Sequence, residues 1–218
     1  MSRPFTIAML SIHSSPIGVL GTRNTGGMSV YVRELAREMG RLGHQVDIFT
    51  HRRHHKDPEV VELAPQVRLV TLDILHRGPL AKADLYHYAN DYRAAIEAFC
   101  RHDARSYDLI HSHYWLSGQV GRLLGHHWRR PHVITFHTLG ALKANTGVGS
   151  AEPDRRLAAE KRLVQNCDAL LVPCEGEKSN LMHYYGADEV TIAMVPGGVD
   201  LERFRPMRKT TARERLGL

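Results

Sequence analysis

Short apolar runs alternate with amphipathic segments along most of the chain, and this alternation restricts the fold more than any other feature. An apolar run at residues 5–11 is followed by a segment, residues 28–42, whose apolar side chains recur at spacings of three and four. These side chains are Met28, Val32, Leu35, Met39 and Leu42. Such spacing predicts a helix with one buried face, Gly43 is the expected helix stop, and residues 45–50 form the next predicted strand. Together they predict a βαβ unit.

The same alternation continues beyond this unit. Further strands are predicted at residues 67–72, 108–112, 132–136, 169–173 and 190–195. Further helices are predicted at residues 85–99, 116–127, 153–166 and 177–185, the last ending at Gly186. Apolar strands separated by helices are typical of a parallel sheet that is covered on both faces. We therefore predict an α/β fold, a Rossmann-like parallel sheet with helices on both faces.

The glycine pair Gly26-Gly27 precedes the first predicted helix. The N–H groups of a first helical turn favour an anion, and glycine lets a phosphate approach closely. A P-loop is excluded because no Gly-Lys-Ser or Gly-Lys-Thr run occurs, and Gly-x-Gly-x-x-Gly does not follow the strand. Asp47 lies about where a dinucleotide-binding domain carries its ribose-binding acid, so that interpretation stays open, as does a plain tight turn.

Composition limits the kinds of partner and the cellular compartment that we expect for this chain. The net charge is +6, but the basic residues are scattered without interleaved aromatic residues, which does not favour a nucleic-acid partner. A basic surface also suits sugar phosphates, nucleotides or peripheral contact with anionic lipids. Three widely spaced cysteines, Cys100, Cys167 and Cys174, favour a cytoplasmic protein, and no run is long and apolar enough to span a membrane. Nothing indicates an oligomeric state.

The carboxyl ends of the predicted strands mark the expected ligand site, because open α/β sheets bind ligands there. These ends are rich in His, Tyr, Thr and Gly, which suit hydroxyls and phosphates. His111 and His113 share one strand face, but no third ligand at a recognisable spacing supports a metal site. After the last strand, Pro196-Gly197-Gly198 leads into a short predicted helix without a following strand. We expect residues 1–198 to form one domain and residues 199–218 to begin a linker to a second domain.

Four motifs occur together: Gly26-Gly27-Met28-Ser29-Val30-Tyr31-Val32, His111-Ser112-His113-Tyr114-Trp115-Leu116-Ser117-Gly118, Phe136-His137-Thr138-Leu139 and Pro196-Gly197-Gly198-Val199-Asp200. With them, the chain resembles the N-terminal domain of retaining GT4-family glycosyltransferases of the GT-B fold. Within the family, it is most similar to the mycothiol-pathway glycosyltransferases and next to the sucrose-phosphate synthases. The resemblance covers nearly all 218 residues.

The resemblance implies a transferase that moves a hexosyl group from a nucleotide sugar to a hydroxyl or sugar-phosphate acceptor with retention. The donor expected first is a UDP-sugar. This chain would be the acceptor-binding half, inactive without the donor-binding domain. It implies donor contacts at Gly26, Gly27 and Met28 and a role for His137 towards the transferred sugar. No metal or further cofactor is expected.

The resemblance also implies a phosphate-binding set. The mycothiol-pathway enzymes hold the acceptor phosphate with a Lys, a Tyr, a Thr and an Arg, and the matching motifs point to Lys82, Tyr114, Thr138 and Arg156. Cations and hydroxyls of this kind suit a phosphate dianion. Arg155 is an alternative to Arg156, and either arginine, Lys82 or Tyr114 could instead have only a structural or solvated role.

Overall fold

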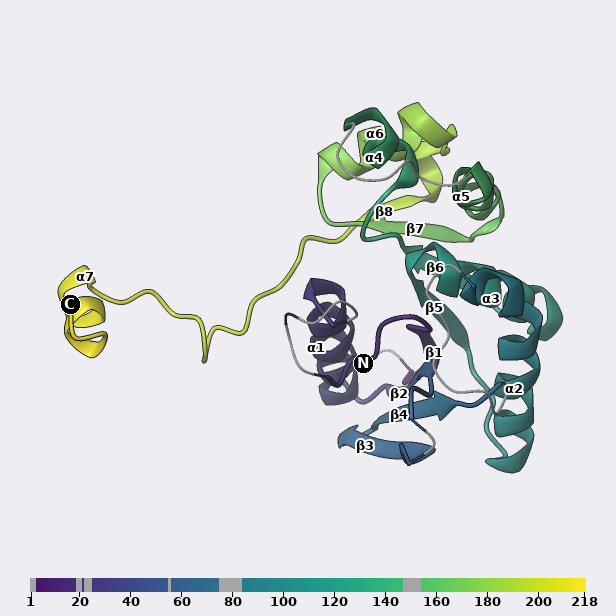
Figure 1. Cartoon of the computed structure of the whole chain (residues 1–218), viewed down its shortest axis with the longest axis horizontal. Coiled ribbons are helices and arrows are strands. Elements are labelled where there is room, and N and C mark those ends of the chain that lie inside the picture. Colours follow the sequence, from purple (N-terminus) through teal and green to yellow (C-terminus); the bar gives the residue numbers. More distant parts are fainter. Residues whose placement is uncertain (1–2, 19–20, 22–24, 55, 75–83, 147–153) are drawn as a thin grey trace.

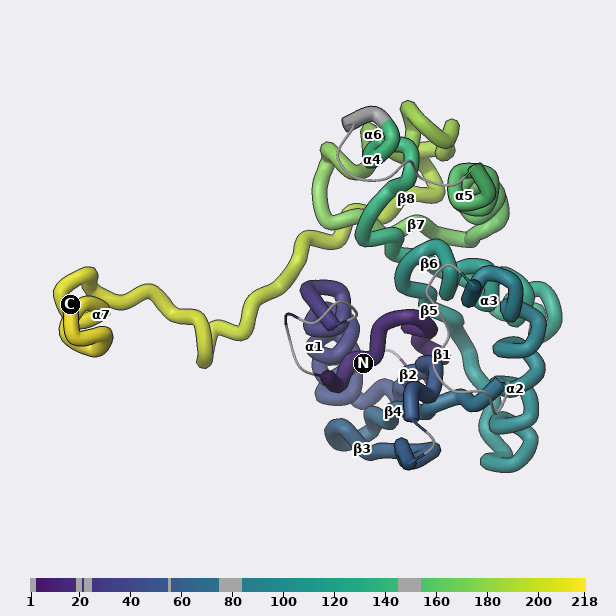
Figure 2. Tube along the Cα trace, in the orientation of Figure 1, coloured from purple at the N-terminus to yellow at the C-terminus, as the bar shows by residue number. Residues whose placement is uncertain are grey.

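The computed structural model describes residues 3–18, 21, 25–54, 56–74, 84–146 and 154–218 (Figure 2). Its centre is one eight-stranded sheet with the order β3-β4-β2-β1-β5-β6-β7-β8. The strands are β1 (Thr6–Leu10), β2 (Gln45–His51), β3 (Val60–Ala64), β4 (Val67–Leu72), β5 (Leu109–His113), β6 (His132–Thr135), β7 (Ala169–Val172) and β8 (Ile192–Met194). All neighbouring pairs are parallel except β3 and β4, which are antiparallel. The predicted parallel α/β sheet is confirmed.

Helices cover the sheet on both sides (Figure 1). They are α1 (Gly27–Arg41), η1 (Leu85–Tyr88), α2 (Ala89–His102), α3 (Tyr114–Trp128), α4 (Gly140–Thr146), α5 (Asp154–Asn166), α6 (Glu175–Tyr185), η2 (Glu189–Thr191) and α7 (Lys209–Arg215). Helices α2 and α3 lie on the side of the sheet opposite α1, and α4, α5 and α6 surround the edge formed by β7 and β8 (Figure 1).

Alternate residues of β1 face two separate hydrophobic cores. Ile7 and Met9 belong to the core beneath α1, whereas Ala8 and Leu10 belong to the larger core beneath α2, α3 and α5. Successive side chains of a strand point to opposite faces, so a strand that is apolar at every position is covered on both. Burial on both faces thus explains why these strands are continuous apolar runs in the sequence.

Helix α3 lies unusually close to the sheet because two of its turns carry glycine. A Cβ on Gly118 would lie 2.7 Å from Ile134 Cδ1, and one on Gly121 would lie 2.1 Å from Ser112 Oγ. These distances leave no room for a side chain. The close approach fixes the start of α3, which carries Tyr114 and Trp115, directly at the end of β5.

The predicted buried face of α1 is correct except at its last position. Val32 and Ala36 are fully buried, but Leu42 is 75% exposed because the helix ends at Arg41. Gly43 takes a left-handed φ of 91° and donates its N–H to Gly40 O, while His44 donates to Met39 O. This pair of hydrogen bonds is a Schellman motif, which turns the chain away before Leu42 can reach the core.

Three elements were not predicted, namely β3, α4 and the 3₁₀ helix η2, which takes up the start of the strand predicted at residues 190–195. One predicted helix is divided. Strand β3 is a half-exposed edge strand with an irregular register between Glu62 and Ala64, so it lacks a clear alternation of buried and exposed residues. The seven-residue α4 is too short to show a helical period. The predicted helix over residues 85–99 begins instead as the 3₁₀ helix η1 and continues as α2.

The C-terminal segment extends away from the sheet (Figures 1 and 2). Residues 195–208 contain no helix or strand and are exposed, and the following helix α7 has no buried residue. This segment contrasts with β8, which pairs with β7 at the sheet edge. Of the described helices, none combines the length and the apolar character needed to cross a membrane.

Candidate functional site

The chain takes unusual backbone conformations just after β5 and β6. Tyr114 directly follows β5 with a φ of 74°, and His137 follows β6 with a φ of 62°. Non-glycine residues rarely adopt this left-handed region, and such strain is concentrated at functional sites. Since β5 and β6 are parallel neighbours, both residues lie at the same edge of the sheet, the edge at which open α/β sheets bind ligands.

Three of the four residues predicted to bind a phosphate come together at this edge. Arg156 donates from Nη2 to the carbonyl oxygen of Thr138 at 2.9 Å and to its Oγ1 at 3.1 Å. The guanidinium carbon of Arg156 also lies 5.0 Å from the ring centroid of Tyr114. Thr138 is exposed, so its hydroxyl proton can be donated to a ligand while its oxygen accepts from Arg156.

Arg156 is buried and ion-paired, which excludes the interpretation that it lies on a solvated helix face. It is 2% exposed, and its Nε donates to Glu160 Oε1 at 2.7 Å. The second oxygen of Glu160 accepts from the N–H of Gly140 at 2.9 Å and from the hydroxyl of Tyr185. That hydroxyl also accepts from the N–H of Ala141 at 3.0 Å. The network fixes Arg156 between α4, α5 and α6.

Of the two other cations predicted for the site, the structure describes only Arg155. Lys82 lies outside the described residues. Arg155 is partly exposed, and its Nη1 lies 3.3 Å from Nε2 of His87 in η1. Tyr86, the preceding residue of η1, packs against Trp115 with ring centroids 5.5 Å apart. Arg155 is therefore at the rim of the cluster formed by Tyr114, Thr138 and Arg156, on the side of η1.

The glycine pair leaves open space at the start of α1. Gly26 is the N-cap residue, and a Cβ built on Gly26 or Gly27 would meet no atom within 4 Å among the described residues. The first turn of α1 carries no acidic side chain that would compete with an anion for the positive end of the helix dipole. Met28 differs from the pair because its side chain packs against both cores. Only its backbone N–H is suited to the predicted donor contact.

His137 lies beside α1 in a group of aromatic side chains. Its Nε2 is 3.0 Å from Nδ1 of His113, and its ring is 5.2 Å from the ring of Tyr31, one turn into α1. Burial lowers the pKa of His137 to about 4, so the imidazole is neutral at pH 7. Within the described residues, no three His, Cys, Asp or Glu side chains are grouped as metal ligands.

A family model for glycosyltransferase family 4 matches residues 25–203, which is most of the chain. The chain belongs to glycosyltransferase family 4. It is 42% identical over 202 residues to a D-inositol 3-phosphate glycosyltransferase of Corynebacterium jeikeium, covering 92% of this chain and 48% of that protein. It is 41% identical over 220 residues to D-inositol 3-phosphate glycosyltransferase 2 of Catenulispora acidiphila, covering 100% of this chain and 52% of that protein.

The fold agrees with the sequence comparison. Sucrose-phosphate synthase from Thermosynechococcus elongatus superposes with a TM-score of 0.87 at 30% identity, over 99% of this chain and 53% of that chain. The chain thus spans about half the length of the family 4 relatives it matches. The architecture is that of the N-terminal half of a GT-B glycosyltransferase.

Asp47 does not have the position that a dinucleotide-binding member of this fold class would need. It lies within β2 and is fully buried. Its carboxylate accepts two hydrogen bonds from Arg68 at 2.8 and 2.9 Å, one from Arg105 at 2.9 Å and one from the hydroxyl of Tyr107 at 2.6 Å. No carboxylate oxygen is left for a ribose, so this family 4 domain uses Asp47 to hold its sheet together.

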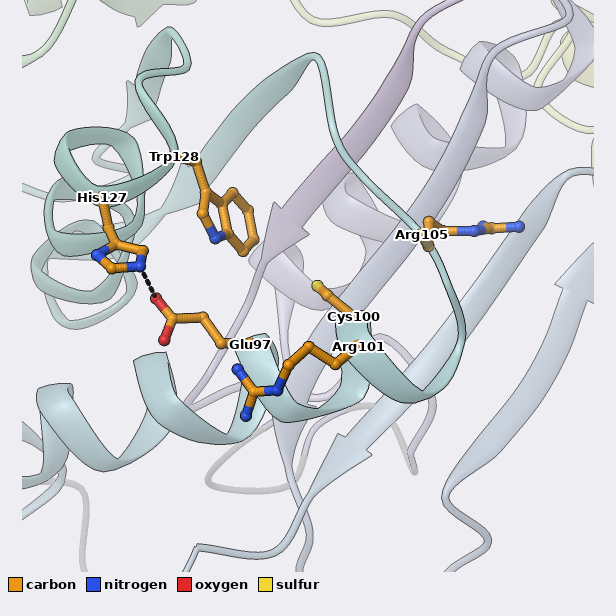
Figure 3. A pocket seen from close by; sticks show the side chains of 6 residues that line it. All are labelled: Glu97, Cys100, Arg101, Arg105, His127 and Trp128. Carbon is orange, nitrogen blue, oxygen red and sulfur yellow. Dashed lines mark ion pairs between the residues drawn. The ribbon is translucent and has the colours of Figure 1, made fainter.

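A surface pocket of about 230 Å³ lies at the opposite edge of the sheet, near the amino end of β5 (Figure 3). Its lining residues come from the ends of α2 and α3 and the loop before β5: Glu97, Cys100, Arg101, Arg105, His127 and Trp128. His127 Nε2 lies 3.6 Å from Glu97 Oε1 (Figure 3). The pocket shares no residue with the cluster around Arg156, so it is separate from the candidate site of this family 4 chain.

Two residues of the candidate site were missed in the sequence. Glu160 follows Arg156 by four positions, a spacing at which helical side chains of opposite charge meet, so the pair was detectable in principle. Tyr185 left no such signal, because its contact with Glu160 joins two helices 25 residues apart in sequence. The strand pattern links His113 only to His111, whereas the structure places it against His137.

Proposed function

We propose that the chain is the acceptor-binding half of a retaining glycosyltransferase that transfers a hexosyl group from a UDP-sugar to a hydroxyl of a phosphorylated acceptor. The relatives named D-inositol 3-phosphate glycosyltransferase make inositol phosphate the first acceptor to test. Residues 1–198 would form the acceptor domain, and residues 199–218 would begin the linker to a donor-binding domain. The three cysteines are free thiols, which supports a cytoplasmic enzyme.

The observation that carries this proposal is the contact of Arg156 with Thr138 and Tyr114 at the carboxyl edge of the sheet. A guanidinium that is already oriented by neighbours loses little freedom when it binds a phosphate oxygen. The exposed hydroxyl of Thr138 adds a donor directly beside it. The phosphate of the acceptor would therefore bind at this cluster, and the ring of the acceptor would lie towards the start of α3 and the loop after β6.

Charge balance explains why further cations are needed. Glu160 compensates the charge of Arg156, so Arg156 alone would not neutralise a phosphate dianion. Arg155 at the rim and Lys82, which precedes η1 by three residues in the sequence, would supply the remaining positive charge. We propose Lys82, Tyr114, Thr138 and Arg156 as the phosphate-binding set, with Arg155 as an additional contact.

The start of α1 and His137 would bind the donor. The open backbone at Gly26 and Gly27 suits the diphosphate of a nucleotide sugar, because the N–H groups in the first turn of a helix are available to phosphate oxygens. His137 would contact the transferred sugar. In front-face transfer, the donor phosphate helps to deprotonate the acceptor hydroxyl, so this domain need not supply a nucleophile.

The test is a transfer assay on a polypeptide that joins this chain to the donor-binding domain that we propose follows it. UDP-glucose, UDP-N-acetylglucosamine and GDP-mannose would each be supplied with inositol phosphate or with free inositol. Transfer from a UDP-sugar to inositol phosphate, with little transfer to free inositol, supports the proposal. Equal use of both acceptors would remove the phosphate site, and absence of transfer from every donor would remove the activity.

A further inference from the structure

His113 and His137 form a hydrogen-bonded pair, and the proposed reaction gives a role only to His137. His113 is the last residue of β5, and His137 follows the neighbouring strand β6. His113 Nδ1 and His137 Nε2 are 3.0 Å apart, a hydrogen-bonding distance. His137 reaches this position with its left-handed φ of 62°, so its backbone is held in a strained conformation where its ring meets His113.

Only one proton can lie between these two nitrogens. Two N–H groups would repel each other at 3.0 Å, and two bare nitrogens would lose the hydrogen bond. Both rings are neutral at pH 7, because burial lowers the pKa of His137 to about 4 and that of His113 well below its ordinary value. Each ring therefore carries one N–H. The ring that donates has its proton on the shared nitrogen, and the ring that accepts has its proton on its other nitrogen.

The surroundings of His113 identify the donor. His113 is fully buried, and its Nε2 has no hydrogen-bond partner within the described residues. If His137 donated, His113 would carry its proton on Nε2 as a buried N–H without an acceptor. If His113 donates from Nδ1, Nε2 is a bare acceptor, and unsatisfied buried acceptors are tolerated better than unsatisfied N–H groups. The second arrangement is favoured.

Among the described residues, the rings packed against the pair offer His113 Nε2 no proton acceptor. His111 lies beside His113 with ring centroids 4.2 Å apart, and its Nε2 is paired with Thr135 Oγ1 at 3.0 Å. Tyr31 presents its ring to both His113 and His137, at 5.9 and 5.2 Å. The contacts with Tyr31 hold both rings in place by packing. The hydrogen bond between His113 Nδ1 and His137 Nε2 then determines which nitrogens carry protons.

We propose that His113 is a positioning residue that keeps the proton of His137 on Nδ1, so that His137 meets its ligand as a neutral hydrogen-bond donor. The ligand would be an oxygen atom, and in the proposed reaction it is a hydroxyl oxygen of the transferred sugar. This identification of the ligand rests on the proposed function, whereas the protonation pattern does not. A general-base role for His137 is then excluded, because Nε2 is occupied and Nδ1 already carries a proton.

The experiment is a long-range ¹H–¹⁵N correlation spectrum of the histidine rings in this chain at pH 7. We expect both His113 and His137 to carry their proton on Nδ1. A proton on Nε2 of His137 would overturn the proposal. In His113→Leu, His137 should shift towards the Nε2–H form that predominates for imidazole in water, whereas His113→Asn, which keeps a side-chain N–H near the original position, should preserve the Nδ1–H form.

Controls separate positioning from folding and from the function itself. His127→Gln changes an exposed histidine on α3 and should leave the His137 signals in place. If His113→Leu does not fold, the unmodified chain and His113→Asn still decide the question. An unchanged His137 tautomer in folded His113→Leu would contradict the positioning role. A correct tautomer in a two-domain protein that transfers no sugar would remove the proposed function and leave the protonation pattern standing.

Discussion

Arg156 Nε lies 2.7 Å from Glu160 Oε1, and both side chains are almost completely buried. When one partner of a buried ion pair is removed, the other charge stays buried without a counter-charge or water around it. Such a loss destabilises the protein strongly. The same pair holds the guanidinium against Thr138. Structural stability and the geometry of the proposed phosphate site therefore depend on one ion pair.

Replacing Glu160 by alanine should destabilise the chain strongly. The change leaves Arg156 buried without its counter-charge, at an expected cost of about 3–5 kcal/mol in the free energy of unfolding. Urea unfolding measures it. Glu38→Ala is a matched control, because Glu38 pairs with Arg41 on the exposed surface of α1 and its loss should cost under about 1 kcal/mol. Similar losses in the two variants would show that burial of the Arg156 pair contributes nothing.

Tyr185→Phe should remove a smaller part of the same network. The hydroxyl donates to Glu160 and accepts from Ala141, so its loss leaves buried polar groups with one partner fewer and should cost about 1–3 kcal/mol. Thermal or urea unfolding gives the value. Tyr88→Phe serves as the control, because the Tyr88 hydroxyl makes no hydrogen bond within the described residues. Equal stability of Tyr185→Phe and the unmodified chain would contradict this reading of the network.

Two glycine substitutions should have opposite consequences. Gly121→Ala places a Cβ 2.1 Å from Ser112 Oγ and 2.3 Å from His132 Nε2, so we expect unfolding or a loss of several kcal/mol, on the order found for overpacked cores. Gly27→Ala meets open space at the start of α1 and should leave stability unchanged or slightly raised. In the two-domain protein, it should instead raise KM for the nucleotide sugar. A normal KM would remove the glycine pair from the donor site.

Acid should destabilise the chain through its buried histidines. Burial lowers the pKa of His111 to about 3 and those of His132 and His137 to about 4, below the ordinary value of 6.5. The unfolded chain then binds more protons than the folded chain between pH 6.5 and 4, so stability falls as the pH falls through this window. We expect a loss on the order of 2 kcal/mol or more between pH 7 and pH 5, measured by urea unfolding. The exposed-site variant His127→Gln should show the same loss, and a flat profile would refute the burial effect.

The sheet was predictable because its strands are buried on both faces. Ile7 to Leu10 are apolar at successive positions for this reason, and Gly43 marks the end of α1 by its left-handed conformation. Leu42 was misassigned because the three-and-four spacing continues one residue beyond the helix. Strand β3 was missed because an edge strand that is half exposed need not be apolar.

The candidate site was predictable only in part. The rule that ligands bind at strand carboxyl ends placed Tyr114 and Thr138 at one edge, but Arg156 comes from a helix, and only the resemblance to family 4 pointed to it. Their ligand-binding roles stay predictions. Asp47 misled because its distance from the glycine pair suited a ribose acid, whereas its actual partners, Arg68, Arg105 and Tyr107, lie far away in the sequence. Such partners cannot be read from local spacing.

The most direct test of the phosphate site compares kcat/KM for inositol phosphate and free inositol in the two-domain protein and its Thr138→Val variant. Valine removes the exposed hydroxyl with little change of shape, and Thr210→Val on α7 is the matched control. We predict a loss of about tenfold with inositol phosphate, equivalent to about 1.4 kcal/mol, and little change with free inositol. An unchanged kcat/KM for inositol phosphate, or equal losses with both acceptors, would contradict the assignment of the phosphate to Tyr114, Thr138 and Arg156.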